Sequence, residues 1–459
     1  MSSDMQVQVL FRAPFKLILV LVNKKLIKRI NTSDNNIVHL IFVGTKPDII
    51  KMAPLYHELQ KRSELVIVCH SGQHYDFNNS KGILAELKMN VDINFKIRGT
   101  LNEKLGQIIQ QTDSLISSLK ETRKIIVPYV HGDTLTACGA ALGLILQKIA
   151  PVHVEAGLRT LTPKSSIYQK HISAVNNNEF NISDYLKDLK NINNYENGSF
   201  EPFPEQIDTR MIDVVSAIRL APNKINYQNI ISERGLTSGT TTIGNTISDA
   251  VYSALERPFY DKKISKLHLS DYIFFTIHRR ETCENPKRFK IVLKTLEGIL
   301  YNGHKVLLIM HPMFNRGVRM CNDIKFKKIE EKYKNTLIVL KPIAHHSDTV
   351  KTINNSKLVI TDSGGLQEEA NILHKQCVTL RYGTDRIESV IYGNNILIPL
   401  INDVFVTRII NEIANIDTDI TGPLYGDNVS RKIVDYVLEH IDDNGLFKTE
   451  EQRLELLCK

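Results

Sequence analysis

From about residue 37 the sequence alternates short apolar runs with longer amphipathic stretches, and this alternation constrains the fold more than any other feature. The first apolar runs are IVHLIFVG, LVIVCH, KIIVPYVHGD and APVHVEAG, with helical stretches such as IIKMAPLYHELQKR and LTACGAALGLILQKI between them. A second series starts near Tyr272 with YIFFTIHRR, KVLLIMHP, TLIVLKP, KLVITDSGG, CVTLRYG and NILIPL. Strands that alternate with helices predict parallel sheets with helices on their faces. The chain is therefore predicted to be α/β, with two such sheets.

The 459 residues, of which 42% are hydrophobic, suffice for two domains. We predict an N-terminal extension over 1–37, a first domain over 38–235, a second domain over 236–430 and a C-terminal segment over 431–459. The Asn-rich stretch of about 160–198 is weakly apolar and is interpreted as a surface insertion or mobile excursion of the first domain.

Composition argues against several classes of protein. The net charge of +8 is spread along the chain without a basic arm or patch, so nucleic acid is not predicted as a partner. The six cysteines form no CxxC pair, which predicts neither a zinc site nor a disulfide framework and fits a reducing cytoplasm. The apolar core within Phe15 to Ile30 is too short to span a bilayer, so no membrane partner is predicted. The motifs GxGxxG, GxxxxGK[ST] and GxSxG are missing, so a bound nicotinamide, a nucleoside triphosphatase or a serine nucleophile is not indicated.

Polar residues follow nearly every predicted strand. They are Gly44, Thr45 and Lys46, Gly72, Gln73 and His74, His131, Gly132 and Asp133, and Glu155 in the first half, and His278, Arg279, Arg280, His311, Asp362 and Ser363 in the second. Ligands of open parallel sheets bind outside the carboxyl ends of the strands. Two sheets facing each other would enclose a cleft there, which is the expected site.

The stretch VITDSGGLQEEA resembles a strand, a turn and the start of a helix. Gly364 and Gly365 let backbone N–H groups approach a phosphate closely, so Ser363 and these glycines are predicted to hold a diphosphate. Glu369 is predicted to accept hydrogen bonds from ribose hydroxyls, as acidic residues do in dinucleotide folds. Plain capping of the helix by the serine and the acidic residues is the alternative.

Three carboxylates of the first half, Asp133, Glu155 and Glu205, suit proton transfer at carbon if they gather, because crowding and burial raise carboxyl pKa values. The alternatives are an N-cap for Asp133, an ion pair between Glu155 and Arg159, and a first-turn position for Glu205. His278 and Arg279 would steady a leaving phosphate, or else form a solvated basic turn. The neighbouring histidines in IAHHSD are weak evidence for a metal and are interpreted as loop residues, and no metal site is predicted.

Taken together and in order, nine motifs resemble the non-hydrolysing UDP-N-acetylglucosamine 2-epimerases. They are VGTKPDIIKMAPL, SGQHYDF, VHGDTLT, VHVEAGLRT, PFPEQID, IHRRET, TDSGGLQEEA, YGTDRIESV and PLYGDNVSRKIVDYV, and they cover about residues 38–440. The resemblance implies two Rossmann-like domains facing across a cleft, of the glycosyltransferase-B type, with the final helix crossing back to the first domain. It also implies epimerisation at C2 by anti elimination of UDP to a 2-acetamidoglucal and re-addition of UDP, with a UDP-sugar substrate, no external cofactor and a homodimer.

The resemblance, together with the strand-end positions, defines the candidate residues. The acid/base set is Asp133, Glu155, Glu205 and His278; the substrate-binding set is Lys46, Lys51, Arg159, Arg279, His311, Ser363, Gly364, Gly365, Glu369 and Arg386; and the activator-binding candidates are Gln73 and His74. Two departures stand out. Lys46 replaces the usual arginine and loses its bidentate fork. Asp208 stands where the family has Asn, and its charge beside Glu205 is expected to raise the pKa of one of the two.

Other functions fit the same motifs. The same chemistry on another UDP-2-acetamido sugar, such as a diacetamido uronic acid, would suit the Asn-rich stretch and Asp208, which can reshape the sugar side. A glycosyltransferase, or a non-catalytic nucleotide-sugar binder, is compatible with the scaffold, because fold does not fix function.

Overall fold

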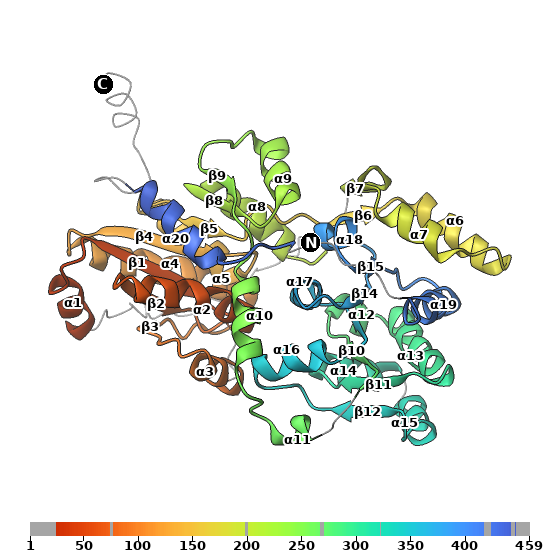
Figure 1. Cartoon of the computed structure of the whole chain (residues 1–459). Helices are drawn as coiled ribbons and strands as arrows, with labels where there is room; N and C mark the ends of the chain where they lie inside the picture. Colours follow the sequence, from red (N-terminus) through yellow and green to blue (C-terminus); the bar gives the residue numbers. More distant parts are fainter. Residues whose placement is uncertain are drawn as a thin grey trace, which may run out of the picture.

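The computed structural model describes residues 24–73, 77–197, 201–266, 270–321, 323–416, 424–441 and 446. Two parallel sheets form separate layered domains, with a smaller two-stranded sheet beside them (Figure 1). The predicted α/β class with two parallel sheets is therefore confirmed. No helix among the described residues is long and apolar enough to cross a membrane.

The first sheet has seven strands in the order β3-β2-β1-β4-β5-β8-β9. The strands are β1 (Ile37–Val43), β2 (Leu65–His70), β3 (Ile93–Asn94), β4 (Ile125–His131), β5 (Val152–Val154), β8 (Ile218–Ala221) and β9 (Thr240–Thr242). Along β1, Ile41 and Val43 enter one hydrophobic cluster, whereas Leu40 and Phe42 enter another on the opposite face. Burial on both faces explains why the strand is an unbroken apolar run.

The second sheet has six strands in the order β12-β11-β10-β13-β14-β15. The strands are β10 (Tyr272–Thr276), β11 (Lys305–Ile309), β12 (Leu337–Leu340), β13 (Leu358–Thr361), β14 (Gln376–Thr379) and β15 (Asn395–Leu397). Every apolar run named above becomes a strand. The strand order reverses between β1 and β4 in one sheet and between β10 and β13 in the other, and such switch points are where ligands bind in these folds.

Helices cover the sheets (Figure 1). Those of the first domain are α1 (Lys24–Asn31), α2 (Lys46–Lys61), α3 (Phe77–Glu86), α4 (Leu101–Lys120), α5 (Leu135–Leu146), α8 (Glu205–Val215) and α9 (Lys224–Arg234). After the linking helices α10 (Ile247–Glu256) and α11 (Lys262–Ser265) come α12 (Arg280–Cys283), α13 (Pro286–Tyr301), α14 (Pro312–Cys321), α15 (Asp323–Lys332), α16 (His346–Asn354), α17 (Gly364–Ile372), α18 (Ile387–Ile391), α19 (Asp403–Ile413) and α20 (Val429–Glu439). Within the predicted N-terminal extension, α1 packs on the first domain because Ile30 is fully buried in its core.

The Asn-rich stretch forms β6 (Leu161–Pro163), α6 (Ser165–Asn176), α7 (Ile182–Leu189), a 3-10 turn (Ile192–Asn194) and β7 (Tyr195–Asn197). It leaves the first domain after β5 but packs on the second, where α6 lies against α19 and α7 against β15 (Figure 1). The Tyr185 hydroxyl donates a 2.7 Å hydrogen bond to the Leu397 carbonyl, and the Tyr185 and Phe405 rings are 5.7 Å apart. Buried aromatic side chains therefore anchor this segment to the second domain, and its interpretation as a surface insertion or mobile excursion stays a prediction.

This anchoring predicts a stability effect. Tyr185→Ala is expected to destabilise the protein by about 3–5 kcal/mol, because it removes a fully buried ring and leaves a cavity. Tyr301→Ala, at a side chain that is 77% exposed, is the matched control and should change stability by less than about 0.5 kcal/mol. Equal thermal unfolding curves for the two variants would contradict the anchoring.

The chain passes between the domains near Gly244 and again near Tyr425, and the two passages are bonded together. The Asn245 N–H donates to the Tyr425 carbonyl at 2.9 Å, and a Cβ on Gly244 would lie 2.6 Å from that oxygen. The Asp249 carboxylate then accepts from the first N–H groups of α20, which lies against α2 of the first domain. β9 lies beyond the boundary predicted at residue 235 and still pairs with β8.

Candidate functional site

The two switch points face each other, and the carboxylates of the first domain lie at one of them. Asp133 follows β4, but Thr134 is the N-cap of α5, since its side chain accepts from the Ala137 N–H. The N-cap alternative for Asp133 is therefore wrong. Glu155 follows β5 with a left-handed φ of +66°, a strained conformation for a residue with a side chain. Such strain persists where the surroundings fix the backbone firmly.

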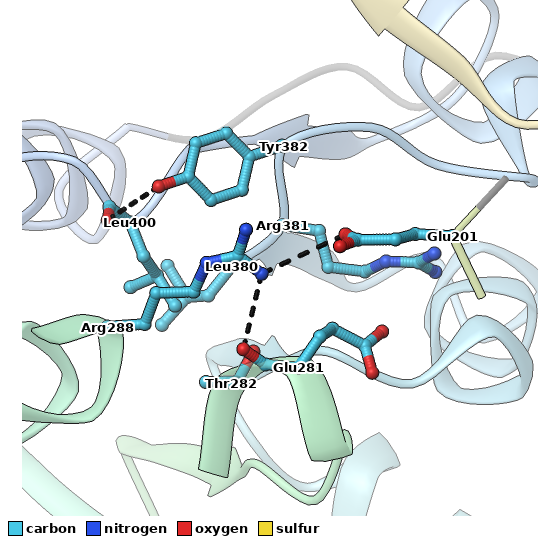
Figure 2. Close-up of a pocket in the computed structure, with 8 residues that line it drawn as sticks. All are labelled: Glu201, Glu281, Thr282, Arg288, Leu380, Arg381, Tyr382 and Leu400. Atoms are coloured by element: carbon cyan, nitrogen blue, oxygen red, sulfur yellow. Dashed lines mark hydrogen bonds and ion pairs between the residues drawn. The ribbon is translucent and has the colours of Figure 1, made fainter. Parts of the chain in front are cut away.

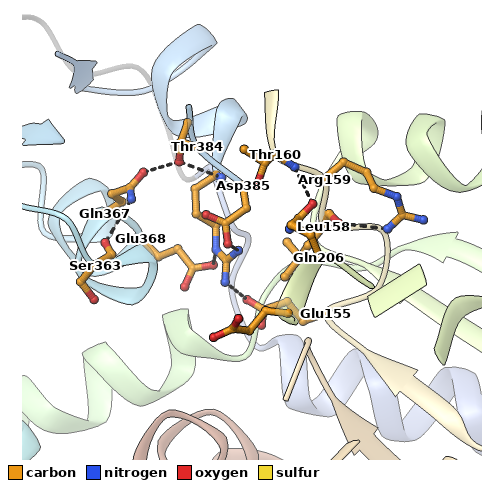
Figure 3. A network of polar contacts seen from close by, with 12 residues as sticks. Glu155, Leu158, Arg159, Thr160, Gln206, Ser363, Gln367, Glu368, Thr384 and Asp385 are labelled. Carbon is orange, nitrogen blue, oxygen red and sulfur yellow. Dashed lines mark hydrogen bonds and ion pairs between the residues drawn. The ribbon is translucent and has the colours of Figure 1, made fainter. Parts of the chain in front are cut away.

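Glu155 lies in a buried network that joins the domains. The Lys51 ammonium donates to Glu155 and, at 2.6 Å, to Glu368 of α17. The Arg386 guanidinium donates to Glu368 at 2.6 Å and lies 3.5 Å from Glu155. Figure 3 shows Glu155 and Glu368 approaching from facing elements of the two domains. Side chains of the two domains therefore meet directly across the gap.

The network shifts the pKa values of its two glutamates in opposite directions. Burial opposes the charge of both, but Lys51 and Arg386 hold the pKa of Glu155 well below its usual range. Burial raises the pKa of Glu368, and the neighbouring Glu155 charge adds to the rise. One of two adjacent carboxyls is thus ionised while the other favours its proton, as expected when like charges share a site.

Two further carboxyls titrate near neutrality. Burial raises the pKa of Asp133 to about 6, and Asp385, Glu205 and Glu155 add to the rise while Arg386 opposes it. Burial raises the pKa of Asp208 to about 7, with contributions from Asp133 and Glu205. The predicted effect of Asp208 is therefore confirmed in direction, although burial is its main cause.

Glu205 is the first residue of α8 and faces the second domain. Its carboxylate lies 3.9 Å from the Arg279 guanidinium across the gap. Arg279 in turn lies in the field of Asp385 and Glu281, which raise its pKa although burial opposes this. The three predicted acid/base carboxylates thus gather at the same gap as the basic turn.

The basic turn after β10 is fixed by a buried acid. The Asp362 carboxylate accepts from the backbone N–H groups of His278 and Arg279, both at 2.9 Å. The His278 and His311 rings lie 5.0 Å apart, and burial lowers the pKa of each to about 4. Both rings are therefore neutral at physiological pH and suit hydrogen bonding to a phosphate. This arrangement is not a solvated basic turn.

The N-terminus of α17 has the features predicted for a phosphate site. The Ser363 side chain makes no capping hydrogen bond, so helix capping does not explain this serine. A Cβ on Gly365 would meet nothing within 4 Å, and one on Gly364 would lie 3.7 Å from the Arg386 guanidinium carbon. The first N–H groups of the helix therefore lie beside open space and a cation.

Glu369 lies beside His346, one of the two histidines interpreted above as loop residues. His346 begins α16, is buried, and lies with Nε2 3.1 Å from Glu369 Oε1. The loop interpretation is wrong for this residue. Glu369 Oε2 is buried without a hydrogen-bond partner in the described part of the chain, which leaves it able to accept from a ribose hydroxyl. The Lys46 ammonium lies nearby and donates to the Ala344 carbonyl at 3.1 Å across the domains.

Two predictions are corrected or left open. The Arg159 side chain is 2% exposed and donates to Glu233 and Asp213, not to Glu155. Arg159 therefore holds the loop after β5 against α8 and α9, and its role in substrate binding stays a prediction. Gln73 accepts from the Thr136 backbone and hydroxyl, whereas His74 lies outside the described residues, so activator binding stays a prediction.

Sequence reasoning missed Glu368 and Asn245. The Asn245 amide, in the passage between domains, donates to Glu155 at 2.8 Å and to Glu368 at 3.0 Å. Glu368 had a signal, its place beside Glu369 after the glycines, but an asparagine in a linker carries none. No group of three or more His, Cys, Asp or Glu side chains suited to a metal occurs within the described ranges.

A small cavity lies next to the basic turn, between α12, the loop after β14 and Glu201 (Figure 2). Its arginines already have partners. Arg288 lies 3.8 Å from Glu201 and stacks 4.4 Å from the Tyr382 ring centre, while Arg381 pairs with Asp385 at 2.9 Å. The residues that line this cavity therefore support one side of the gap, and the cavity is not the expected ligand site.

Two Rossmann-like domains with polar groups at both switch points define an enzyme of the glycosyltransferase-B fold type. The sequence profile of the UDP-N-acetylglucosamine 2-epimerase family matches residues 57–170 and 196–438. The chain therefore belongs to the UDP-N-acetylglucosamine 2-epimerase family. Residues 171–195, within the Asn-rich stretch, fall outside the match.

Individual relatives of known sequence are also 2-epimerases of UDP-sugars. The chain is 29% identical over 369 residues to a UDP-N-acetylglucosamine 2-epimerase of Methanocaldococcus jannaschii, covering 78% of this chain and 87% of the relative. It is 26% identical over 406 residues to the UDP-2,3-diacetamido-2,3-dideoxy-D-glucuronate 2-epimerase of Pseudomonas aeruginosa, covering 87% and 98%.

Solved structures match over most of the chain. The M. jannaschii epimerase in complex with UDP-GlcNAc and UDP superposes with a TM-score of 0.70 at 26% identity, covering 88% of this chain and 99% of that one. The Neisseria meningitidis epimerase bound to UDP-GlcNAc gives 0.68 at 27% identity, covering 88% and 100%.

Proposed function

We propose that the protein interconverts UDP-N-acetylglucosamine and UDP-N-acetylmannosamine by reversible epimerisation at C2. The observation that carries this proposal is the contact between an acidic wall and a phosphate-binding wall. Glu155 of the first domain meets Lys51, Arg386 and Glu368 beside the N-terminus of α17. Membership of the family supports it.

The proposed reaction has two balanced steps. A carboxylate takes the proton from C2 while the C1–O bond breaks, and the bonding electrons leave with the β-phosphate oxygen of UDP. The products are a 2-acetamidoglucal and UDP. Re-addition of UDP with delivery of a proton to the opposite face of C2 gives the epimer, so two acid/base groups must flank the ring.

Asp133 is the proposed group that changes protonation state. A pKa of about 6 lets it both accept and return a proton at neutral pH, since efficient acid/base catalysts have a pKa near the working pH. Glu155 is held ionised by Lys51 and Arg386, which suits it to stabilise positive charge or to act as the opposing base. Glu205 completes the set beside Arg279.

The second domain is proposed to hold UDP. The N–H groups of Gly364 and Gly365 and the Arg386 and Arg279 guanidiniums would bind the diphosphate, with His278 and His311 as neutral donors. Glu369 would accept from the ribose. Because Lys51 and Arg386 are paired with Glu155 and Glu368 in the closed arrangement, we infer that the domains separate to admit the nucleotide and close again to exclude water from the glycal.

The test starts from each epimer separately. Either UDP-sugar should relax to the same equilibrium mixture without an acceptor and without accumulation of free sugar. Consumption only when an acceptor is present would identify a transferase instead.

A second candidate is the same reaction on a UDP-diacetamido uronic acid. The similarity to the Pseudomonas aeruginosa relative, which this chain covers over 98% of its length, supports this second candidate. A panel of UDP-2-acetamido sugars, with products read by NMR, decides between the two sugars by the ratio of kcat/KM.

Gly365 provides a direct test of the phosphate site. Gly365→Asp should weaken UDP binding by about 10–100-fold, because it places a negative charge beside the diphosphate position. It should leave stability almost unchanged, since its Cβ meets nothing within 4 Å. Gly365→Ala is the matched control and should bind UDP normally. Titration calorimetry checks both, and unchanged UDP affinity in Gly365→Asp would contradict the proposed position.

A further inference from the structure

Asp213 lies at the last turn of α8, the helix that begins with Glu205, and its carboxylate is 1% exposed. It does not reach the gap, yet each hydrogen bond of its carboxylate leads to a segment that carries a proposed acid/base group. One oxygen, Oδ1, lies 2.8 Å from His153 Nδ1 and accepts from the Gly157 N–H at 3.3 Å. The other, Oδ2, accepts from Arg159 at 2.9 Å. Asp213 thus joins α8 to two loops.

The contact with His153 leads to Asp133. The second ring nitrogen of His153, Nε2, lies 2.7 Å from the carbonyl oxygen of Gly132, the residue before Asp133. The fully buried ring of His153 thus lies between the Asp213 carboxylate and the Gly132 carbonyl. It connects Asp213 to the loop that carries Asp133.

The contacts with Gly157 and Arg159 lead to Glu155. Glu155 and Gly157 both have left-handed φ values, of +66° and +81°. A Cβ on Gly157 would lie 2.2 Å from the Asn226 carbonyl oxygen, so this turn is pressed against α9. A strained turn of this kind holds its shape only where the surrounding bonds over-determine it. Asp213 supplies two of those bonds.

We propose that Asp213 is the positioning residue that sets the Asp133 loop and the Glu155 turn relative to Glu205. His153 links Asp213 to the Asp133 loop. Gly157 and Arg159 link it to the Glu155 turn. This inference rests on the proposed epimerase reaction. It does not involve the nucleotide side of the gap, because all of these residues belong to the first domain.

The first test is Asp213→Asn, which keeps the shape of the side chain and removes its charge. Because a displacement of about 1 Å costs on the order of 10²-fold in rate, kcat should fall by about 10–100-fold with the KM for the UDP-sugar and the affinity for UDP little changed. Glu233→Gln is the matched control. Glu233 also accepts from Arg159 but lies at the surface of α9, with its side chain 31% exposed. It should keep kcat within about twofold of wild type.

The second test is independent of how well Asp213→Asn folds. His153→Asn removes only the link to Gly132, and it should lower kcat by a similar factor. The double variant should be no slower than the slower single variant, since residues acting through one chain of contacts are not additive. Backbone amide NMR should show the signals of Gly132, Asp133 and Glu155 displaced in Asp213→Asn but unchanged in Glu233→Gln.

The outcomes separate the two proposals. Wild-type kcat in both single variants, losses that multiply in the double variant, or an equal loss in Glu233→Gln would overturn the positioning role. A wild-type protein that fails to epimerise any UDP-sugar would overturn the proposed function. In that case unchanged amide signals of Asp133 and Glu155 in Asp213→Asn would still reject the positioning role on their own.

Discussion

Asp133→Asn is expected to lower kcat by about 10²–10⁴-fold and, in the same protein, to raise stability. The loss of activity follows because an amide can neither take nor return the C2 proton. UDP should still bind with affinity within a few-fold of wild type, since its proposed contacts lie in the second domain. Steady-state assays and titration calorimetry measure the two quantities.

The gain in stability follows from the raised pKa of Asp133. Its folded pKa of about 6 lies above the usual value of 3.8 for an aspartate, so the folded state holds its proton more tightly. The stability associated with that proton is present at low pH and is lost as pH rises from about 4 through 6. At pH 8 the asparagine variant should therefore be more stable by about 1–3 kcal/mol, and the gain should shrink at pH 5.

Asp208→Asn is the matched control. Asp208 is buried, its pKa is raised to about 7, and no proton transfer is assigned to it. The variant should gain stability at pH 8 while keeping its activity. If Asp133→Asn retains normal turnover, or if both variants lose it equally, Asp133 is not the proton-transferring group.

Lys51→Met is expected to lower stability strongly. Lys51 is the cation shared by Glu155 and Glu368, whose side chains are 3% and 1% exposed. Its removal leaves Arg386 as the cation that still pairs with both buried carboxyls, and breaking such a buried pair typically costs about 3–5 kcal/mol. Turnover should fall with it, because the charge that holds Glu155 ionised is lost.

A compensating variant separates charge from shape. Lys51→Met combined with Glu155→Gln removes one charge of each sign and should recover most of the lost stability without restoring turnover. Glu368→Gln alone should be close to wild type in stability, because burial already favours the protonated form of this carboxyl. Chemical unfolding of the three variants tests this. A double variant as unstable as Lys51→Met would reject the shared-cation account.

The fold could be predicted because the apolar runs of buried parallel strands are local signals. The grouping of Asp133, Glu155 and His278 followed as well, since strand ends meet at a switch point. The contacts within the site could not be predicted, because they depend on how the helices pack in three dimensions. Neighbours on a helix point about 100° apart, so Glu369 faces His346 whereas Glu368 faces Lys51, and the sequence does not say which is which.

Two features gave no local signal. The spacing of four residues allows an ion pair between Glu155 and Arg159, but the left-handed turn between them carries the guanidinium away to Asp213. The Asn-rich stretch is weakly apolar, and Phe405, which Tyr185 contacts on the second domain, lies more than two hundred residues away. Long-range packing of this kind leaves no local pattern.

The central claim is that carboxylates of the first domain exchange the C2 proton of a sugar whose UDP is held by the second. Incubation of the purified protein with UDP-N-acetylglucosamine in D₂O, followed by NMR, tests it most directly. The account predicts deuterium at C2 of both epimers, with Asp133→Asn silent in the same assay. Interconversion without any deuterium at C2, or no exchange into any UDP-2-acetamido sugar of the panel, would contradict it.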